Sequence, residues 1–147
     1  MLLLADDIFT KNNCKGVLFT NAVYLEQFLP YISSELAILI NINTPSAMTN
    51  DQWLKMNKTL DKIYSLGWFN GKVTIGCNLC MEIDDYSFIW DIVDKYKLKL
   101  VRTSVTAPTK QEYKNDKDKY YNIMLPKLLN FVKEAEKRNV TLGKDCN

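Results

Sequence analysis

The stretch Leu36-Ala-Ile-Leu-Ile-Asn-Ile-Asn-Thr-Pro45 decides the fold that the sequence predicts. Its β-branched and aliphatic residues are typical of a buried strand, in which side chains alternate between two faces. Three isoleucines share one face, and the other face ends in the amides of Asn41 and Asn43. In a parallel α/β sheet, ligands bind at this carboxyl end, where loops and helix N-termini carry unpaired N–H groups. We therefore expect the two asparagines to contact a small polar ligand.

Three further segments are predicted to form strands of the same character, at residues 16–22, 72–79 and 98–108. In each of them apolar side chains alternate with small or polar ones, and the polar face is most marked toward the carboxyl end. A last strand is expected at 140–143. Each of the first four predicted strands thus has one apolar face and one face that becomes polar toward its carboxyl end, like the stretch at 36–45.

Helical spacing of apolar residues predicts helices at 24–32, 51–66, 86–95 and 120–138. Thr49 or Asn50 can cap the second helix, and Asp84 or Asp85 can cap the third. A weaker helical pattern at 2–9 begins without a cap. The side chains expected to be buried on the second helix are Trp53, Leu54, Met56, Leu60, Ile63 and Tyr64.

The alternation of strands and helices defines the fold class. A strand and a helix that repeat four times before a last strand imply parallel pairing with right-handed crossovers. Open doubly wound sheets and barrels of the triose-phosphate-isomerase (TIM) type both satisfy this order. A barrel is favoured, because its inner faces can be small and polar at one end, whereas central strands covered on both faces are usually apolar throughout.

Length and composition restrict the function classes. The 147 residues are enough for one compact domain, and a net charge of +2 without a basic stripe argues against nucleic acid as a partner. Asp6 and Asp7 interrupt the first apolar residues, so a signal peptide is not expected, and no run is long enough to span a bilayer. We therefore expect a cytoplasmic protein without a membrane partner, which acts on small molecules or contacts other proteins.

Histidine is absent from the sequence, and this excludes the commonest general base and zinc ligand. The four cysteines are sparse, unlike a secreted disulfide framework, and are expected to be reduced. Cys77 and Cys80 have a spacing found in redox and metal sites, but strand alternation turns Cys77 toward the helices, and no second pair exists. The expectation is a buried structural thiol and no metal site.

Taken together, these segments resemble the C-terminal two-thirds of the partial barrel of radical S-adenosylmethionine (radical SAM) enzymes. The motifs that carry the resemblance are Leu18-Phe-Thr-Asn21, Ile40-Asn-Ile-Asn-Thr-Pro45, Val73-Thr-Ile-Gly-Cys-Asn78 and Val101-Arg-Thr-Ser104. It covers nearly the whole chain through the order and spacing of these motifs. It implies an α/β fold whose parallel β-sheet forms part of a TIM-like (β/α) barrel, with about four βα units plus a last strand.

In that family a Cys-x3-Cys-x2-Cys loop holds a [4Fe–4S] cluster, and a Gly-Gly-Glu-Pro-like segment binds the methionine amino group. Neither motif occurs in this sequence, and the family pattern places both upstream of Met1. We therefore expect residues 1–147 to be a single-domain fragment of such a barrel, inactive alone and binding neither cofactor. The full-length parent would use the cluster and S-adenosylmethionine to form a 5′-deoxyadenosyl radical.

The resemblance also implies roles for individual residues. Asn41 and Asn43 would lie near the ribose or the methionine carboxylate, Gly76 and Asn78 near the adenine, and Arg102 near the substrate or the carboxylate. The complete set of expected cofactor-binding residues is Thr20, Asn21, Asn41, Asn43, Gly76, Asn78, Arg102 and Ser104. Cys146 matches a position after which many of these enzymes carry cysteines for an auxiliary cluster, but a single cysteine does not predict a metal.

Each of these residues also has a structural interpretation. The asparagine amides can satisfy loop backbone at a strand end, Arg102 can form an internal ion pair, and Gly76 can relieve crowding. The acidic residues Glu82, Asp84 and Asp85 beside a helix start are more simply explained as capping and dipole charge than as an acid/base or Mg²⁺ site.

Two functions of other classes remain open from the sequence. One is a non-redox TIM-like enzyme acting on sugar phosphates, although no glycine-rich phosphate loop and no clear acid/base pair are present. The other is a non-catalytic interaction module, because a half-barrel leaves unpaired strand edges that favour self-association. For the radical SAM parent, the resemblance implies a small molecule or a peptide as the substrate.

Overall fold

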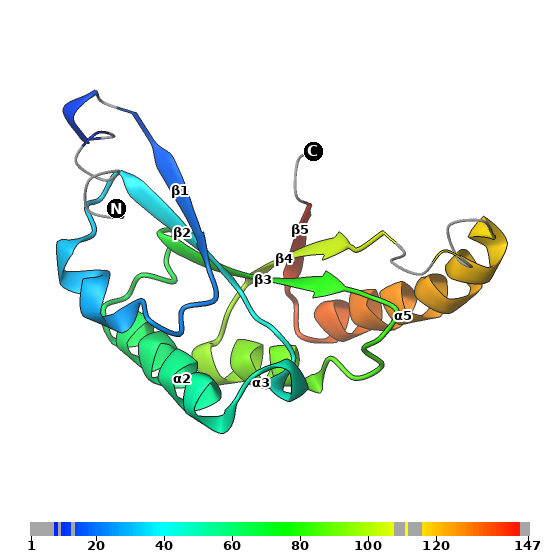
Figure 1. Cartoon of the computed structure of the whole chain (residues 1–147). Coiled ribbons are helices and arrows are strands. Elements are labelled where there is room, and N and C mark those ends of the chain that lie inside the picture. Colours follow the sequence, from blue (N-terminus) through cyan, green and yellow to red (C-terminus); the bar gives the residue numbers. More distant parts are fainter. Residues whose placement is uncertain (1–7, 9, 13, 108–110, 112–115, 145–147) are drawn as a thin grey trace. The chain divides into compact units, whose positions relative to one another are not determined.

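The structure, a computed structural model, describes residues 8, 10–12, 14–107, 111 and 116–144 (Figure 1). Contacts between residues divide the chain into two compact units, Met1–Ile75 and Gly76–Asn147. Cys146 lies outside the described residues. So does the helix expected at 2–9, except for Ile8.

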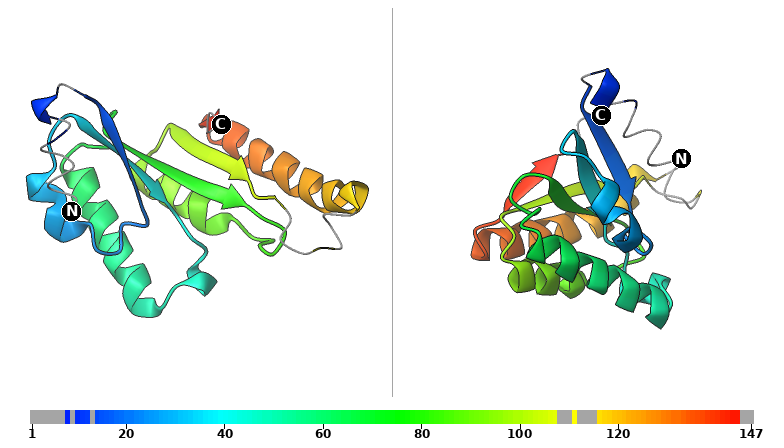
Figure 2. Two further views of the ribbon diagram at one scale, coloured as in Figure 1. Left: turned by 45° about the horizontal axis from the view of Figure 1, so that its top comes forward. Right: turned by 90° about the vertical axis from the view of Figure 1, so that its left-hand side faces the viewer.

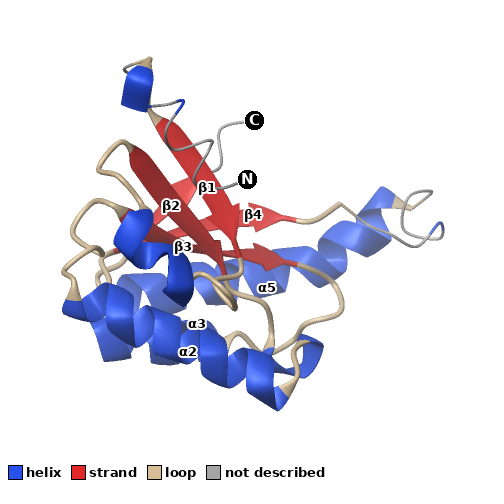
Figure 3. Ribbon diagram, turned by 60° about the vertical axis from the view of Figure 1, so that its left-hand side comes forward, coloured by secondary structure: helices blue, strands red, loops and turns tan. Residues whose placement is uncertain are grey.

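The first unit is built on two parallel strands, β1 (Gly16–Thr20) and β2 (Leu36–Asn41). Leu18 lies opposite Ile38 and Thr20 lies opposite Ile40, so the two polar carboxyl ends are in register. As predicted, the isoleucines of the 36–45 stretch are buried and Asn43 is exposed. The helix α2 (Asn50–Ser65) lies along one side of these strands (Figures 1 and 3).

The N-terminus of α2 is set by a capping box. The Thr49 side chain accepts a hydrogen bond from the Gln52 N–H, and the Gln52 side chain accepts one from the Thr49 N–H. The predicted buried stripe is only partly correct, because Leu54 is 68% exposed and Tyr64 is also exposed. The buried positions on this helix are Met56, Thr59, Leu60 and Ile63. The stripe is thus narrower than the spacing of apolar residues suggested.

The segment between β1 and β2 contains the short helix predicted at 24–32, although it is shorter than the predicted range. It forms a 3₁₀ helix, Glu26–Tyr31, with Pro30 inside it. Proline lacks the N–H that an interior α-helical position needs, and 3₁₀ geometry is common in short connections. Leu29 is buried and anchors this helix in the core, and the chain becomes extended at Ile32, before β2 begins at Leu36.

The second unit contains β4 (Leu100–Val105), β5 (Thr141–Lys144), and the helices α3 (Ser87–Tyr96) and α5 (Lys117–Lys137). β4 and β5 pair in parallel, with Arg102 opposite Gly143. Helix α5 begins three residues before the predicted start, because Asp116 caps it through a 2.9 Å hydrogen bond from the Lys119 N–H. Figure 2 shows α5 as the long helix of this unit.

Aromatic side chains join α3 to α5. The Phe131 ring lies 4.5 Å from the Trp90 ring and 5.7 Å from the Tyr86 ring, edge-on to the latter. Such pairs contribute about 0.5–1.5 kcal/mol beyond the area that they bury. Arg138 covers the outer face of Trp90 at 5.3 Å and pairs with Asp94 and Glu134. The two helices are therefore held as one layer.

The strand β3 (Val73–Leu79) contributes residues to both units, and the five described strands follow the order β1-β2-β3-β4-β5 in one parallel sheet. The α/β class and the parallel sheet are confirmed. Among the described strands the sheet is open, and it does not close on itself as a complete TIM barrel would. No helix within the described ranges combines the length and the hydropathy needed to cross a membrane.

Candidate functional site

The carboxyl ends of β3 and β4 bring two of the predicted site residues into contact. Ser104 Oγ donates a hydrogen bond of 2.6 Å to Asn78 Oδ1, across 26 positions of sequence. Asn78 is exposed and Ser104 is half-buried, so the pair lies at a surface that a ligand can reach. Because Oδ1 accepts from Ser104, the amide group of Asn78 is left to face water or a ligand.

Strand alternation explains why Asn78 is presented in this way. The side chains of Val73, Ile75, Cys77 and Leu79 are buried, as the sequence predicted, and Asn78 therefore points to the opposite face. Gly76 is buried on that same polar face. It adds no side chain beside the Asn78 amide, and its own backbone is covered by the rest of the chain.

Arg102 also lies on the polar side of β4, where a glycine of the neighbouring strand makes room for it. A Cβ atom at Gly143 would lie 3.4 Å from Arg102 Cγ and 3.3 Å from Leu100 Cδ1, closer than most real contacts. Arg102 is half-buried and already takes part in interactions within the chain. Both interpretations of Arg102, as an internal partner and as a ligand contact, are compatible with this placement.

Cys77 occupies the buried face, as expected for a structural thiol. Burial raises the pKa of its thiol to about 12, and the neighbouring Thr103 side chain opposes the rise. Thr103 Oγ1 is itself buried and makes no hydrogen bond of ordinary geometry in the described part of the chain, so its contact with the thiol is weak. A thiol held neutral to such a high pH is a poor nucleophile and a poor metal ligand.

The loop that follows β3 is fixed by a tyrosine at the start of α3. The Cys80 N–H donates to the Tyr86 hydroxyl at 2.8 Å, and this hydroxyl donates to the Asn78 carbonyl at 3.3 Å. Burial raises the pKa of Tyr86 well above its usual value, which keeps the hydroxyl protonated and able to donate. Tyr86 therefore holds the backbone on both sides of Leu79.

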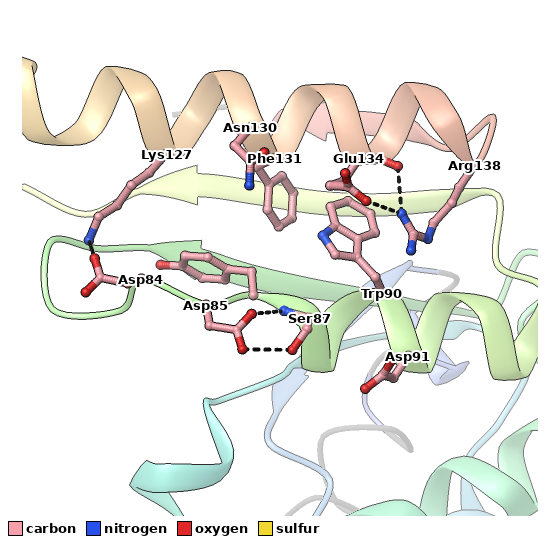
Figure 4. Close-up of a pocket in the computed structure, with 11 residues that line it drawn as sticks. Asp84, Asp85, Ser87, Trp90, Asp91, Lys127, Asn130, Phe131, Glu134 and Arg138 are labelled. Atoms are coloured by element: carbon pink, nitrogen blue, oxygen red, sulfur yellow. Dashed lines mark hydrogen bonds and ion pairs between the residues drawn. The ribbon is translucent and has the colours of Figure 1, made fainter.

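A lysine of α5 holds the same loop. Lys127 Nζ donates to the carbonyl oxygens of Met81 at 2.5 Å, Ile83 at 2.9 Å and Cys80 at 3.4 Å. It also forms an ion pair of 2.8 Å with Asp84, which Figure 4 shows reaching toward it. The Lys127 side chain is 13% exposed and that of Asp84 is 91% exposed, so the carbonyl contacts are the better shielded ones. Asp84 thus ion-pairs with a lysine.

The other predicted cap residue, Asp85, accepts hydrogen bonds from the N–H and the hydroxyl of Ser87. Its carboxylate therefore bonds to the first residue of α3, but the N-cap position is Tyr86 and not one of the two predicted aspartates. Beside it a cavity of about 240 Å³ lies between α3 and α5, with Trp90 and Phe131 among its walls (Figure 4). The charged groups Lys127, Glu134 and Arg138 that line it are already engaged within the protein.

In the first unit, the predicted pair Asn41 and Asn43 also meets. Asn41 Nδ2 donates to Asn43 Oδ1 at 3.4 Å, a long hydrogen bond between two side chains on one face of the chain. A bond of this length is weak, so either amide can turn to another partner at little cost. Both residues lie where the sequence placed them, at the carboxyl end of β2.

Thr20 and Asn21 have local roles that the sequence did not show. Thr20 Oγ1 accepts from the Ala22 N–H at 3.0 Å, and Asn21 Oδ1 accepts from the Val23 N–H at 3.2 Å. These bonds support a turn in which Ala22 has a φ of 63°, and Thr59 Oγ1 donates to the Ala22 carbonyl from α2. The oxygens of both predicted residues are thus used by the turn itself.

The described cysteines do not form a metal site. Cys14 is exposed, Cys77 is buried, and Cys80 is intermediate. Nowhere in the described ranges do three cysteine, aspartate or glutamate side chains gather as a metal ion requires. Comparisons of the chain with known protein families, with curated proteins and with solved structures find no match.

Proposed function

We propose that this chain forms part of the partial barrel of a radical SAM enzyme and contributes to the wall that binds S-adenosylmethionine. The single observation that carries the proposal is the hydrogen bond between Ser104 and Asn78, which joins polar side chains at the carboxyl ends of two parallel strands. Ligands of α/β sheets bind at that end. The parallel order of the strands agrees with the proposal.

The residues of the second unit suit the nucleoside part of such a ligand. The amide group of Asn78 can donate to an acceptor nitrogen of adenine, while Ser104 holds the Asn78 side chain in place. Gly76, two residues before Asn78 on the same strand, is buried and carries no side chain that would crowd the Asn78 amide. Arg102 supplies a positive charge on the same strand as Ser104, suited to a carboxylate.

The iron–sulfur cluster does not fit the residues described here. A cluster of this family needs three thiolates that leave one iron open, and Cys77 is buried with a raised pKa on the face opposite Asn78. We therefore assign no electron-transfer step to this chain. Its residues bind and orient the ligand, and the full enzyme would obtain the cluster from residues outside Met1–Asn147.

Titration of the chain with S-adenosylmethionine, followed by ¹H–¹⁵N NMR, tests the proposal. In contrast to the expectation from the sequence that residues 1–147 bind neither cofactor, the proposal requires the chain alone to retain affinity for S-adenosylmethionine. We expect saturable shifts at Gly76 and at the Asn78 side-chain amide, and the Asn78→Ala variant should weaken binding at least tenfold. Thr74→Ala is the matched control, because Thr74 lies on the same face of β3 but four positions before Asn78. Unchanged binding by Asn78→Ala, or no shifts at these positions, would contradict the proposal.

A sugar phosphate provides the comparison with the non-redox alternative. Ribose 5-phosphate shares the ribose of S-adenosylmethionine but lacks adenine and carries a phosphate. Shifts at the same residues with ribose 5-phosphate, and none with S-adenosylmethionine, would favour a sugar-phosphate enzyme. Adenosine alone should reproduce the shifts at Gly76 and Asn78 if the radical SAM proposal holds.

A second candidate function, self-association, is favoured by β1. Phe19 is 67% exposed and Val17 is 51% exposed on this strand, which lies at one end of the strand order. Exposed apolar side chains on an edge strand are a template for pairing with another chain.

We propose that a second copy pairs at β1. Sedimentation analysis should then show concentration-dependent dimers, which Phe19→Lys abolishes and Tyr24→Lys, at another exposed aromatic, does not. A monomer at every concentration would overturn this candidate.

A further inference from the structure

Helix α5 holds the segments that leave both β3 and β4. Lys127 bonds to the loop after β3, and seven residues earlier the Tyr120 hydroxyl donates to the Thr106 carbonyl at 2.5 Å. A separation of seven residues places the two side chains on one face of a helix. The exit segments are also joined to each other, because the Thr106 N–H donates to the Leu79 carbonyl at 2.8 Å.

The environment of Lys127 Nζ resembles the coordination shell of a small cation. Three backbone carbonyl oxygens, from Cys80, Met81 and Ile83, and the Asp84 carboxylate converge on the ammonium group. Carbonyl oxygens that point at one place repel each other unless a positive charge or a donor lies between them. The ammonium group is therefore the element that allows the loop to keep this conformation.

The loop is coupled to the Asn78 and Ser104 pair through short backbone links. Tyr86 bonds to both Asn78 and Cys80, and the carbonyl of Cys80 is one of the Lys127 acceptors. A rotation of the Cys80 peptide group is therefore passed on to the backbone of Asn78 through the Tyr86 hydroxyl. The Ser104 side has a similar link, since Tyr120 fixes Thr106 two residues further along the chain.

We propose that Lys127 and Tyr120 are positioning residues that set the geometry of the Asn78–Ser104 pair for ligand binding. Lys127 does so as an internal cation, and Tyr120 does so through its hydroxyl. The inference rests on the proposed function for its ligand, but the ordering of the loop can be measured without one. In this proposal, Lys127 and Tyr120 of α5 control the conformation at the carboxyl ends of β3 and β4.

The test compares Lys127→Ala with Lys133→Ala, an exposed lysine on the same helix. In Lys127→Ala we expect ¹⁵N order parameters of residues 80–84 to fall from about 0.85 to below about 0.6. Affinity for S-adenosylmethionine should fall about tenfold, within the usual range of coupling between two sites. Ammonium chloride should restore both properties, and an equal concentration of tetramethylammonium chloride, which has no N–H donors, should not. Lys133→Ala should change neither.

Several results would overturn the proposal. Unchanged order parameters in Lys127→Ala would show that the ammonium group does not hold the loop. A mobile loop with unchanged affinity would show that the loop does not position the pair. If Lys127→Ala fails to fold, Lys127→Met retains the side-chain stem, and Tyr120→Phe removes only a hydroxyl. Absence of S-adenosylmethionine binding by the wild-type chain would instead refute the proposed function, and the order parameters with ammonium would still decide the role of Lys127.

Discussion

Ser104 Oγ donates to Asn78 Oδ1 over 2.6 Å, and this bond fixes the orientation of an exposed amide. Replacing Ser104 with Ala should destabilise the protein by only about 0.5–1.5 kcal/mol, because the bond is solvent-accessible. The Asn78 amide should then rotate, which is measurable as averaged side-chain ¹⁵N–¹H shifts. Ser104→Thr retains the hydroxyl and serves as the control. A still-ordered Asn78 amide in Ser104→Ala would show that other contacts hold it.

The stability of the protein should fall at alkaline pH through Cys77. The folded chain keeps this thiol protonated up to a pKa of about 12, whereas an ordinary thiol loses its proton near 9.0. The unfolded state therefore releases the proton first, and stability is full below pH 9 and is lost as the pH rises toward 12. The slope is about 1.4 kcal/mol per pH unit in that window.

Urea unfolding between pH 8 and 11 measures this slope. The Cys77→Ala variant should be less stable near pH 8, because it removes a buried group, yet it should show a shallower alkaline decline. Cys14→Ala, at an exposed thiol, is the matched control and should follow the wild type. If the unfolding free energies of the wild type and Cys77→Ala fall equally steeply with pH, Cys77 is not the cause of the alkaline loss of stability.

Gly143 should resist substitution because of Arg102 and Leu100. A Cβ atom there would be 3.3–3.4 Å from both side chains, so Gly143→Ala requires a small shift and Gly143→Val a larger one. We expect destabilisation of about 1–3 kcal/mol for Gly143→Val by thermal unfolding. Combining it with Arg102→Ala should recover part of the loss. Additive effects in this double-mutant cycle would mean that the crowding lies elsewhere.

Lys97 offers a stabilising substitution. It ends α3 in the left-handed conformation, with a φ of 54°, and it is exposed. Glycine adopts this conformation without the steric cost borne by other residues. Lys97→Gly should therefore stabilise the protein by about 0.5–1 kcal/mol. Lys95→Gly, in the last helical turn, should destabilise it by about 1 kcal/mol instead. A loss of stability in Lys97→Gly would refute the strain argument.

The repeating periodicities of the sequence were sufficient to predict most of the fold. Alternation along the 36–45 stretch and along β3 correctly assigned the buried faces, because a strand with one covered face must repeat every two residues. The short helix expected at 24–32 is present at Glu26–Tyr31, but its 3₁₀ type, which the proline at 30 favours, was not predicted. Leu54 was assigned to the core by helical spacing, but the covered positions of this helix are Met56, Thr59, Leu60 and Ile63.

The candidate site was predictable only in part. The Asn78 and Ser104 positions follow from alternation, but their hydrogen bond depends on the register of two strands, which local sequence does not encode. Lys127 could not be identified, because a single lysine in a charged helix is ordinarily solvated, and its partners lie more than 40 positions away. The hydrogen bonds of Thr20 and Asn21 to following N–H groups are local, and the pattern of such turns could have revealed them.

The partners of Lys127 in the loop after β3 are mostly main-chain oxygens, and every residue type supplies one. Residues 81 and 83 can therefore be substituted without removing the hydrogen bonds from Lys127 to their carbonyl oxygens. The single lysine, by contrast, supplies the charge on which these oxygens converge. A designer can thus vary the side chains of the loop after β3 one by one while leaving α5 unchanged.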